Sequence, residues 1–168
     1  MNIEKYYNNI DILDKKISAF IKKKKLERIT KNDSLVRAHI EKAKHNYRFF
    51  KKNSYQHEHF DWLIVILYYT LYHTALALLV HKQYVSKNHT ATLCVLIKEY
   101  GISKKELLLF KDLRISKDDA QLYTTLKKER QKASYTTHSL FSNDRISDYS
   151  EKVLTFLEKA QDIITADR

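Results

Sequence analysis

The stretch LKKERQKASYTTH, close to the C-terminal end, holds the side chains best suited to bind and process a phosphate group. Arg130 precedes Tyr135, with four residues between them, and His138 follows three residues after the tyrosine. The planar guanidinium of arginine matches two phosphate oxygens, and a nearby histidine or tyrosine can exchange a proton. Lys127 and Lys132 add positive charge beside Arg130. The spacing predicts a phosphate site, with a solvated basic patch as the alternative.

The most apolar part of the chain, FDWLIVILYYTLYHTALALL, also carries polar-tipped rings. Residues three or four apart share a face of a helix, so this segment presents two adjoining faces. One face carries Trp62, Ile66, Tyr69 and His73, and the other carries Asp61, Val65, Tyr68 and Tyr72. A buried polar ring needs a hydrogen-bond partner, because an unpaired polar group costs about 1–3 kcal/mol. By itself, the pattern is typical of a helix in a protein core.

The charge of the chain favours a partner that carries phosphates. Its 168 residues have a formal net charge of +11, and a basic surface attracts nucleic acid. A codon bias toward Lys, Ile, Asn and Tyr would give the same excess without a functional cause. The single glycine excludes a glycine-rich phosphate loop, and no CxxC or HExxH motif occurs. His57, Glu58 and His59 are interpreted as exposed loop residues, so no metal and no cofactor are expected.

The elements that position these residues are all expected to be helices. With one Gly, no Pro and no long alternating window, the chain is predicted to be all-α and to form a single domain over residues 1–168. Asn32, Asp33 and Ser34 supply capping side chains, and Gly101 is expected to end a helix in the left-handed conformation. The predicted helices cover residues 3–28, 34–52, 61–83, 89–100, 103–110, 116–135 and 146–164.

Cysteine usage and hydropathy predict a cytoplasmic protein. The only cysteine, Cys94, lies among apolar residues, which predicts a buried thiol in a reducing compartment. The N-terminal residues lack the apolar core of a signal peptide. The run from Trp62 to Val80 is long enough to cross a membrane, but its tyrosines, threonines and histidine favour the central helix of a bundle. We therefore expect no membrane segment.

Together, these segments resemble a HEPN domain (higher eukaryotes and prokaryotes nucleotide-binding). The similarity is greatest to the stand-alone prokaryotic kind found beside minimal nucleotidyltransferases. In the order of the family, the matching segments are FDWLIVILYYTLYHTALALL, SKNHTATLCVLIKEYG, RQKASY and a closing amphipathic helix. The resemblance covers residues 34–164 and leaves residues 1–30 as an additional N-terminal helix. It implies a HEPN-like bundle of four to five core helices that often forms a homodimer.

Active members of this family are metal-independent ribonucleases. Their arginine binds and polarises the scissile phosphate, and a histidine four to six residues later handles the proton for 2′-hydroxyl attack. The resemblance maps that arginine onto Arg130 and places Tyr135 at the position of the histidine. Tyrosine, with a pKa near 10, is a poor base at neutral pH. His138 and His89 are therefore the candidate proton carriers.

The resemblance also implies neighbours for Arg130. Asp61 would orient the guanidinium, and Tyr69 and His73 would lie against it on the same side of the helix. Tyr68 and Tyr72 would remain in the core.

Three hypotheses for function follow from these observations. The first is an RNA-directed effector, a ribonuclease of the toxin or antiviral defence type. The second is a non-catalytic HEPN module that binds a nucleotide or RNA, or pairs with a nucleotidyltransferase antitoxin for which Tyr135 is the modification target. The third is a helical scaffold whose charge reflects codon usage alone. A steep salt dependence of RNA affinity would distinguish the first two from the third.

Overall fold

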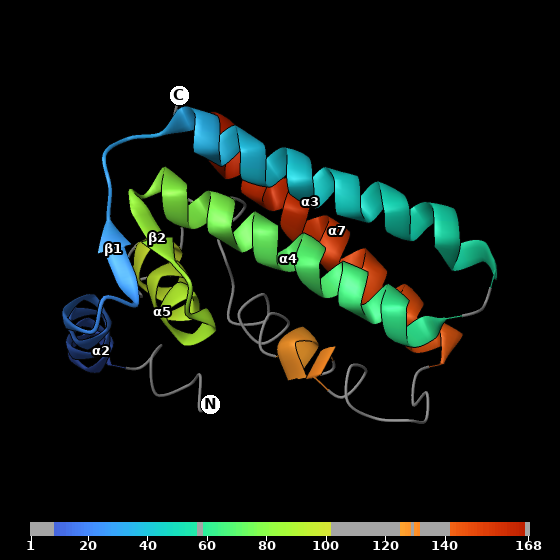
Figure 1. Ribbon diagram of the computed structural model, residues 1–168, viewed down its shortest axis with the longest axis horizontal. Coiled ribbons are helices and arrows are strands. Elements are labelled where there is room, and N and C mark those ends of the chain that lie inside the picture. Colours follow the sequence, from blue (N-terminus) through green and yellow to red (C-terminus); the bar gives the residue numbers. More distant parts are fainter. Residues whose placement is uncertain (1–8, 57–58, 102–124, 129, 132–141, 167–168) are drawn as a thin grey trace, which may run out of the picture.

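Three long helices lie side by side and form the body of the molecule (Figure 1). The computed structural model describes residues 9–56, 59–101, 125–128, 130–131 and 142–166. This part of the chain is mostly helical, which confirms the prediction of an all-α protein. Its elements are α2 (Ile10–Lys22), β1 (Leu26–Arg28), α3 (Asp33–Asn53), a 3₁₀ turn (Ser54–Gln56), α4 (Phe60–His81), β2 (Tyr84–Ser86), α5 (His89–Tyr100) and α7 (Asn143–Ala166).

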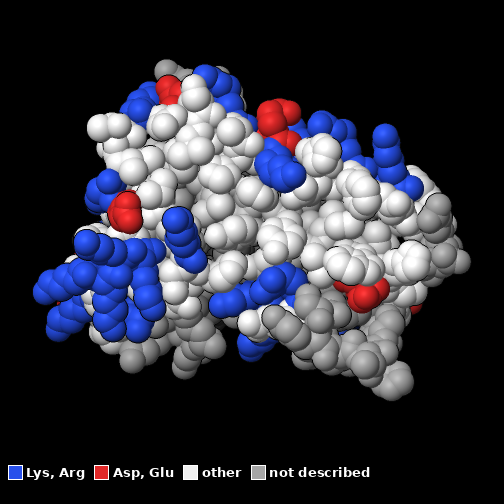
Figure 2. All heavy atoms as spheres, in the orientation of Figure 1, with Lys and Arg blue, Asp and Glu red and all other residues white. Residues whose placement is uncertain are grey.

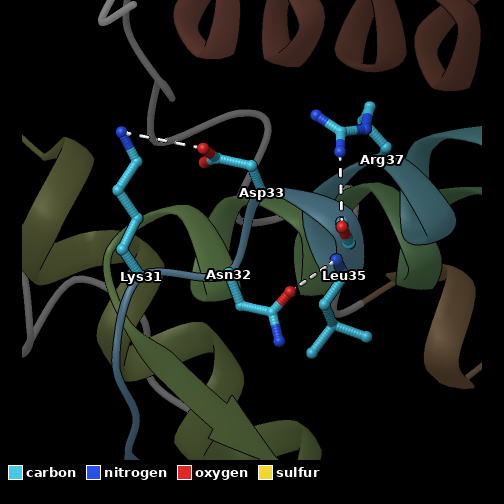
Figure 3. Close-up of polar contacts among 6 residues, drawn as sticks. Lys31, Asn32, Asp33, Leu35 and Arg37 are labelled. Carbon is cyan, nitrogen blue, oxygen red and sulfur yellow. Dashed lines mark hydrogen bonds and ion pairs between the residues drawn. The ribbon is translucent and has the colours of Figure 1, made fainter.

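The start of α3 shows how the sequence fixes a helix end. The side chain of Asn32 accepts a hydrogen bond from the backbone N–H of Leu35 at 2.9 Å, as an N-cap residue does (Figure 3). Asp33 places an acid in the first turn, where the helix dipole favours negative charge, and it pairs with Lys31 at 3.8 Å. Arg37 donates to the hydroxyl of Ser34 at 3.3 Å. The predicted capping segment is thus confirmed.

The central helix is α4, which packs against both α3 and α7. It is apolar on every side, which is the composition of a helix surrounded by protein. Its length and composition alone would allow it to cross a membrane, but 67% of its most apolar window is buried inside the molecule. This degree of burial is typical of the core helix of a soluble protein.

A small sheet corrects the prediction for the N-terminal helix. We expected one helix up to Arg28, but α2 ends at Lys22 and Leu26–Arg28 forms β1. This strand pairs antiparallel with β2, with Leu26 opposite Ser86 and Arg28 opposite Tyr84. Leu26 is fully buried, and the guanidinium of Arg28 lies 3.8 Å from the centre of the Tyr84 ring. Strands of three residues are too short to show an alternating pattern, so hydrophobic periodicity could not predict them.

The role of Gly101 also differs from the prediction. It caps α5 with φ −84° and ψ 155°, which is extended backbone and not the left-handed conformation. A Cβ atom at this position would lie 2.0 Å from the carbonyl oxygen of Ile97, so the residue must be glycine for steric reasons. The left-handed position after α2 is filled by Lys24, with φ 51°, and the one after α4 by Gln83, with φ 62°.

Two further predictions concern the C-terminal half. Helix α7 begins at Asn143, three residues before the predicted start, so the last residues of the predicted loop belong to the helix. The predicted helix 103–110 lies outside the described residues. The part of the predicted helix 116–135 that is described, 125–128 and 130–131, is helical. Cys94 is fully buried, as predicted, and burial raises the pKa of its thiol to about 11.

Candidate functional site

Tyr68 lies at the centre of the candidate site. Its side chain is fully buried in the middle of α4. Its hydroxyl lies 2.8 Å from Nδ1 and 3.2 Å from Nε2 of His89, the first residue of α5. The polar tip of this buried ring therefore has a partner on another element, and the pair joins α4 to the start of α5.

Arg130 lies over the ring of Tyr68. Its guanidinium carbon is 4.9 Å from the ring centre, a distance at which the face of an aromatic ring attracts a cation. The Nε atom of Arg130 is buried and has no hydrogen-bond partner among the described residues. An arginine held in this way is suited to bind an anionic oxygen, because its Nε–H donor is free to form a hydrogen bond.

The protonation states of this cluster follow from burial. Burial raises the pKa of Tyr68 well above its usual range, and the charge of Arg130 offsets this rise only in part. Burial also lowers the pKa of His89, and the positive charges of Lys127 and Arg130 lower it further. At neutral pH the phenol therefore keeps its proton and the imidazole is uncharged. An uncharged imidazole has one nitrogen with a lone pair, so His89 can act as a proton acceptor.

Tyr72 completes the aromatic cluster on α4. Its ring centre lies 4.8 Å from that of His89, and its ring is stacked on Tyr68 at 6.0 Å. Burial raises the pKa of Tyr72 as well. Both tyrosine rings therefore pack against His89.

The structure separates residues that the sequence had grouped around Arg130. The ring beneath the guanidinium belongs to Tyr68, where we expected Tyr69 and His73. Tyr69 is 40% exposed and meets Tyr68 edge-on at 5.4 Å, while His73 contacts α3. Asp61 and Arg130 are both described, and no ion pair joins them, so Asp61 does not orient the guanidinium here.

The other predicted site residues divide into two groups. Lys127 is described, and its charge reaches His89, so Lys127 and Arg130 act on the same imidazole. Tyr135, His138 and Lys132 lie outside the described residues, and their predicted roles stay predictions. His89, one of the two candidate proton carriers, lies near Arg130, since both contact Tyr68.

The adjoining face of α4 carries a histidine, His73, that pairs with a histidine of α3. Nδ1 of His73 lies 3.1 Å from Nδ1 of His39 on α3. Burial lowers the pKa of His39, and burial together with the charges of His39 and Lys42 lowers that of His73 to about 4. At neutral pH both rings are uncharged, so one Nδ1–H donates to the lone pair of the other. This pair joins α3 to α4.

Sequence reasoning missed the contribution of Tyr68, Tyr72 and His39. For the tyrosines a signal existed, because helical spacing already put Asp61, Tyr68 and Tyr72 on one face. That face, and not the one with Tyr69, is the face that meets Arg130. For His39 there was no signal, because its partner lies 34 residues away and the register between two helices is set by packing.

A hollow of about 220 Å³ lies elsewhere, between α3 and α7. It is lined by Val36, Arg37, Ile40, Glu41, Lys44, Gln161, Ile164 and Thr165. None of the predicted site residues borders it, and Lys44 is paired with Glu41 at 3.3 Å. The chemistry is therefore concentrated at Tyr68, His89 and Arg130.

No model of a known protein family matches the chain, and no curated protein matches it in sequence. The argument for function accordingly rests on the site itself.

Proposed function

We propose that the chain is a HEPN-type, RNA-directed effector of the cytoplasm, a metal-independent ribonuclease of the toxin or antiviral defence type. One observation carries this proposal: Arg130, with a buried donor left unsatisfied, lies on the ring of Tyr68, whose hydroxyl is hydrogen-bonded to His89. RNA cleavage through the 2′-hydroxyl needs a cation that binds the phosphate and a base that accepts a proton. Arg130 and the uncharged imidazole of His89 are two such groups, and both contact Tyr68.

In this reaction each residue has a separate task. Arg130 holds two oxygens of the scissile phosphate and stabilises the charge that builds up on them in the transition state. His89 removes the proton from the 2′-hydroxyl, and the 2′-oxygen attacks the phosphorus to form a 2′,3′-cyclic phosphate. The bond to the 5′-oxygen of the next nucleotide breaks, and this oxygen takes a proton from water to leave as a hydroxyl. Tyr68 orients His89 and keeps its own proton, because burial raises its pKa. Lys127 keeps His89 uncharged by its own positive charge.

The alternative is a HEPN module that binds a nucleotide or RNA without cutting it. The observation that favours it is the 2.8 Å contact between Tyr68 and Nδ1 of His89, which occupies one nitrogen of the only imidazole described next to Arg130. Such a module would act through a partner such as a nucleotidyltransferase antitoxin. In both cases a homodimer would bring two Arg130 sites into one assembly.

The test is RNA decay in the presence of EDTA, which removes metal-dependent contaminants. We expect the purified protein to degrade total RNA and Arg130→Ala to lose about 100-fold or more of that activity, as when one transition-state donor is removed. His89→Asn should lose activity to a similar extent. Arg48→Ala removes an exposed arginine of α3 and is the matched control, which should keep full activity.

The outcomes separate the two functions. Loss of cleavage in Arg130→Ala and His89→Asn, with Arg48→Ala unchanged, supports the ribonuclease. RNA binding that depends on Arg130 without cleavage by any variant supports the binding module. Equal decay in all samples, or neither binding nor decay, would contradict both.

A further inference from the structure

The positive charge of the chain is concentrated in one short segment. Residues 15–28 contain seven Lys or Arg and one Glu, which is a net charge of +6 of the +11 of the whole chain. By contrast, α7 contains five acidic and three basic residues, a net charge of −2. A uniform codon bias does not produce this contrast between two segments of one chain.

The fold gathers these charges at one corner of the molecule. Figure 2 shows Lys and Arg side chains clustered at the lower left, over the position of α2 in Figure 1. All of them are exposed, whereas Leu13 and Ile17 on the other side of α2 are buried. We call this surface the basic corner, and it consists of Lys15, Lys16, Lys22, Lys23, Lys24, Lys25 and Arg28.

The turn after α2 spreads the lysines. The N–H of Lys25 bonds to the carbonyl of Phe20 and that of Lys24 to the carbonyl of Ile21, which is the double hydrogen bond of a Schellman motif. Lys24 occupies the left-handed position, with φ 51°, where glycine is preferred. The chain thus reverses within the lysine run, so that the run covers a corner and does not continue along one helix.

The basic corner is joined directly to the candidate site. The hydroxyl of Ser86 donates to the carbonyl of Lys25 at 3.0 Å, and His89 follows three residues later in the chain. Three residues span at most about 11 Å. Lys87, which is exposed, lies between them and adds a further positive charge. Stacked nucleotides rise about 3.4 Å each, so this distance corresponds to at most about three nucleotides of a single strand.

We propose that the basic corner is a docking surface for single-stranded RNA, which runs from Lys22–Lys25 across Lys87 to Arg130. This inference rests on the proposed function and specifies its substrate as a strand that extends several nucleotides beyond the cleaved bond. The lysines bind the flanking phosphates, and Arg130 binds the phosphate at the site of cleavage.

An anionic membrane is the other polyanion to consider. A membrane-binding helix inserts an apolar face next to its basic residues. In α2 most of that face is occupied, because Leu13 and Ile17 are buried in the core and α2 packs against α5. Ile10 and Ile21 are exposed, but they lie at the two ends of the helix and do not form a continuous apolar face. The observations therefore favour RNA.

The experiment compares two variants that lose equal charge. The first is Lys23→Gln with Lys24→Gly, in which glycine suits the left-handed position, so the fold should be kept or stabilised. The matched control is Lys51→Gln with Lys52→Gln, which removes two exposed lysines from the last turn of α3. Affinity for a 12-nucleotide and a 3-nucleotide RNA is measured against salt, and binding to phosphatidylserine vesicles is measured in parallel.

We expect the Lys23/Lys24 variant to bind the long RNA about tenfold more weakly and to lower its salt slope by about 1.4, since each phosphate contact on a single strand contributes about 0.7. Its affinity for the short RNA should stay unchanged. The control should match the unmodified protein. Equal losses in the two variants, or a loss confined to vesicle binding, would overturn the docking surface. Arg130→Ala tests the site separately, because it should weaken binding of both RNAs whether or not the basic corner is correct.

Discussion

The two sides of α4 use similar residues for different purposes. On one side, His73 faces His39 of α3, and their Nδ1 atoms lie 3.1 Å apart. On the other side, Tyr68 faces His89 of α5 and carries Arg130 on its ring. Both sides place a polar ring against a histidine from a neighbouring helix, and this ring is fully buried in Tyr68 and partly buried in His73.

The two sides differ in whether their polar groups have hydrogen-bond partners. The His39–His73 pair consists of two uncharged rings that satisfy one another and join two helices. The Tyr68 side contains a permanent cation with a buried Nε that has no partner within the described residues. A polar ring in a core helix is therefore not evidence of a site by itself. A site requires a charged neighbour whose hydrogen bonds the protein does not complete.

The largest expected effect distinguishes Tyr68 from its neighbour Tyr69. Tyr68→Ala leaves a cavity beside His89 and should cost about 3–5 kcal/mol of unfolding free energy, as for other large buried rings. Tyr69→Ala, at an exposed position, should cost less than about 1 kcal/mol. Urea denaturation of both variants measures the two values. Similar losses would show that the two rings are equally buried.

The next largest effect is expected on RNA cleavage, which should depend on the Tyr68 side of α4 and not on the His73 side. Arg130→Ala should reduce RNA cleavage by about 100-fold or more, because it removes a donor to the transition state. His39→Ala, on the other side, should leave the cleavage rate within about threefold, since it only loosens a helix contact. Rates are measured with EDTA at a temperature where circular dichroism shows both variants folded. A large loss of cleavage in His39→Ala would make the histidine pair part of the site.

A smaller effect on the free energy of unfolding is expected when the pH is lowered and the histidine pair is protonated. The pKa of His73 is about 4 in the folded protein and 6.5 in the unfolded chain. Between these pH values the unfolded state binds more protons than the folded state. The contribution of His73 to the free energy of unfolding is therefore fully present above pH 6.5 and is lost as the pH falls through 4. His73→Gln should flatten this part of the curve of unfolding free energy against pH. A curve equally steep in the variant would assign the acid sensitivity to other groups.

The smallest effect concerns the charge beside His89. Lys127→Gln removes a positive charge that lowers the pKa of His89, so that pKa should rise toward 6.5. NMR titration of the imidazole protons measures the change. The pKa of His73 should stay constant in the same variant, because the neighbours that lower it are His39 and Lys42. A shift of both histidines would indicate a general loss of packing.

The sequence by itself determined most of the helices and one half of the site. Asn32 and Asp33 start α3 where capping chemistry predicts, and the apolar run from Phe60 to His81 forms the central helix. These features are local, because caps and helical periodicity depend on residues within one or two turns. Arg130 was recognisable from its residue type and spacing for the same reason.

Only the tertiary structure decided which residues meet. Tyr68 and His89 are 21 residues apart, and His39 and His73 are 34 apart, so each contact depends on how two helices are packed. The strand pairing of Leu26 with Ser86 likewise depends on the end of α4 and the end of α2 lying together. A one-residue choice between Tyr68 and Tyr69 rotates the contact by about 100° around the helix. Packing of α4 against the rest of the core determines that Tyr68 meets Arg130, and helical periodicity alone cannot predict this.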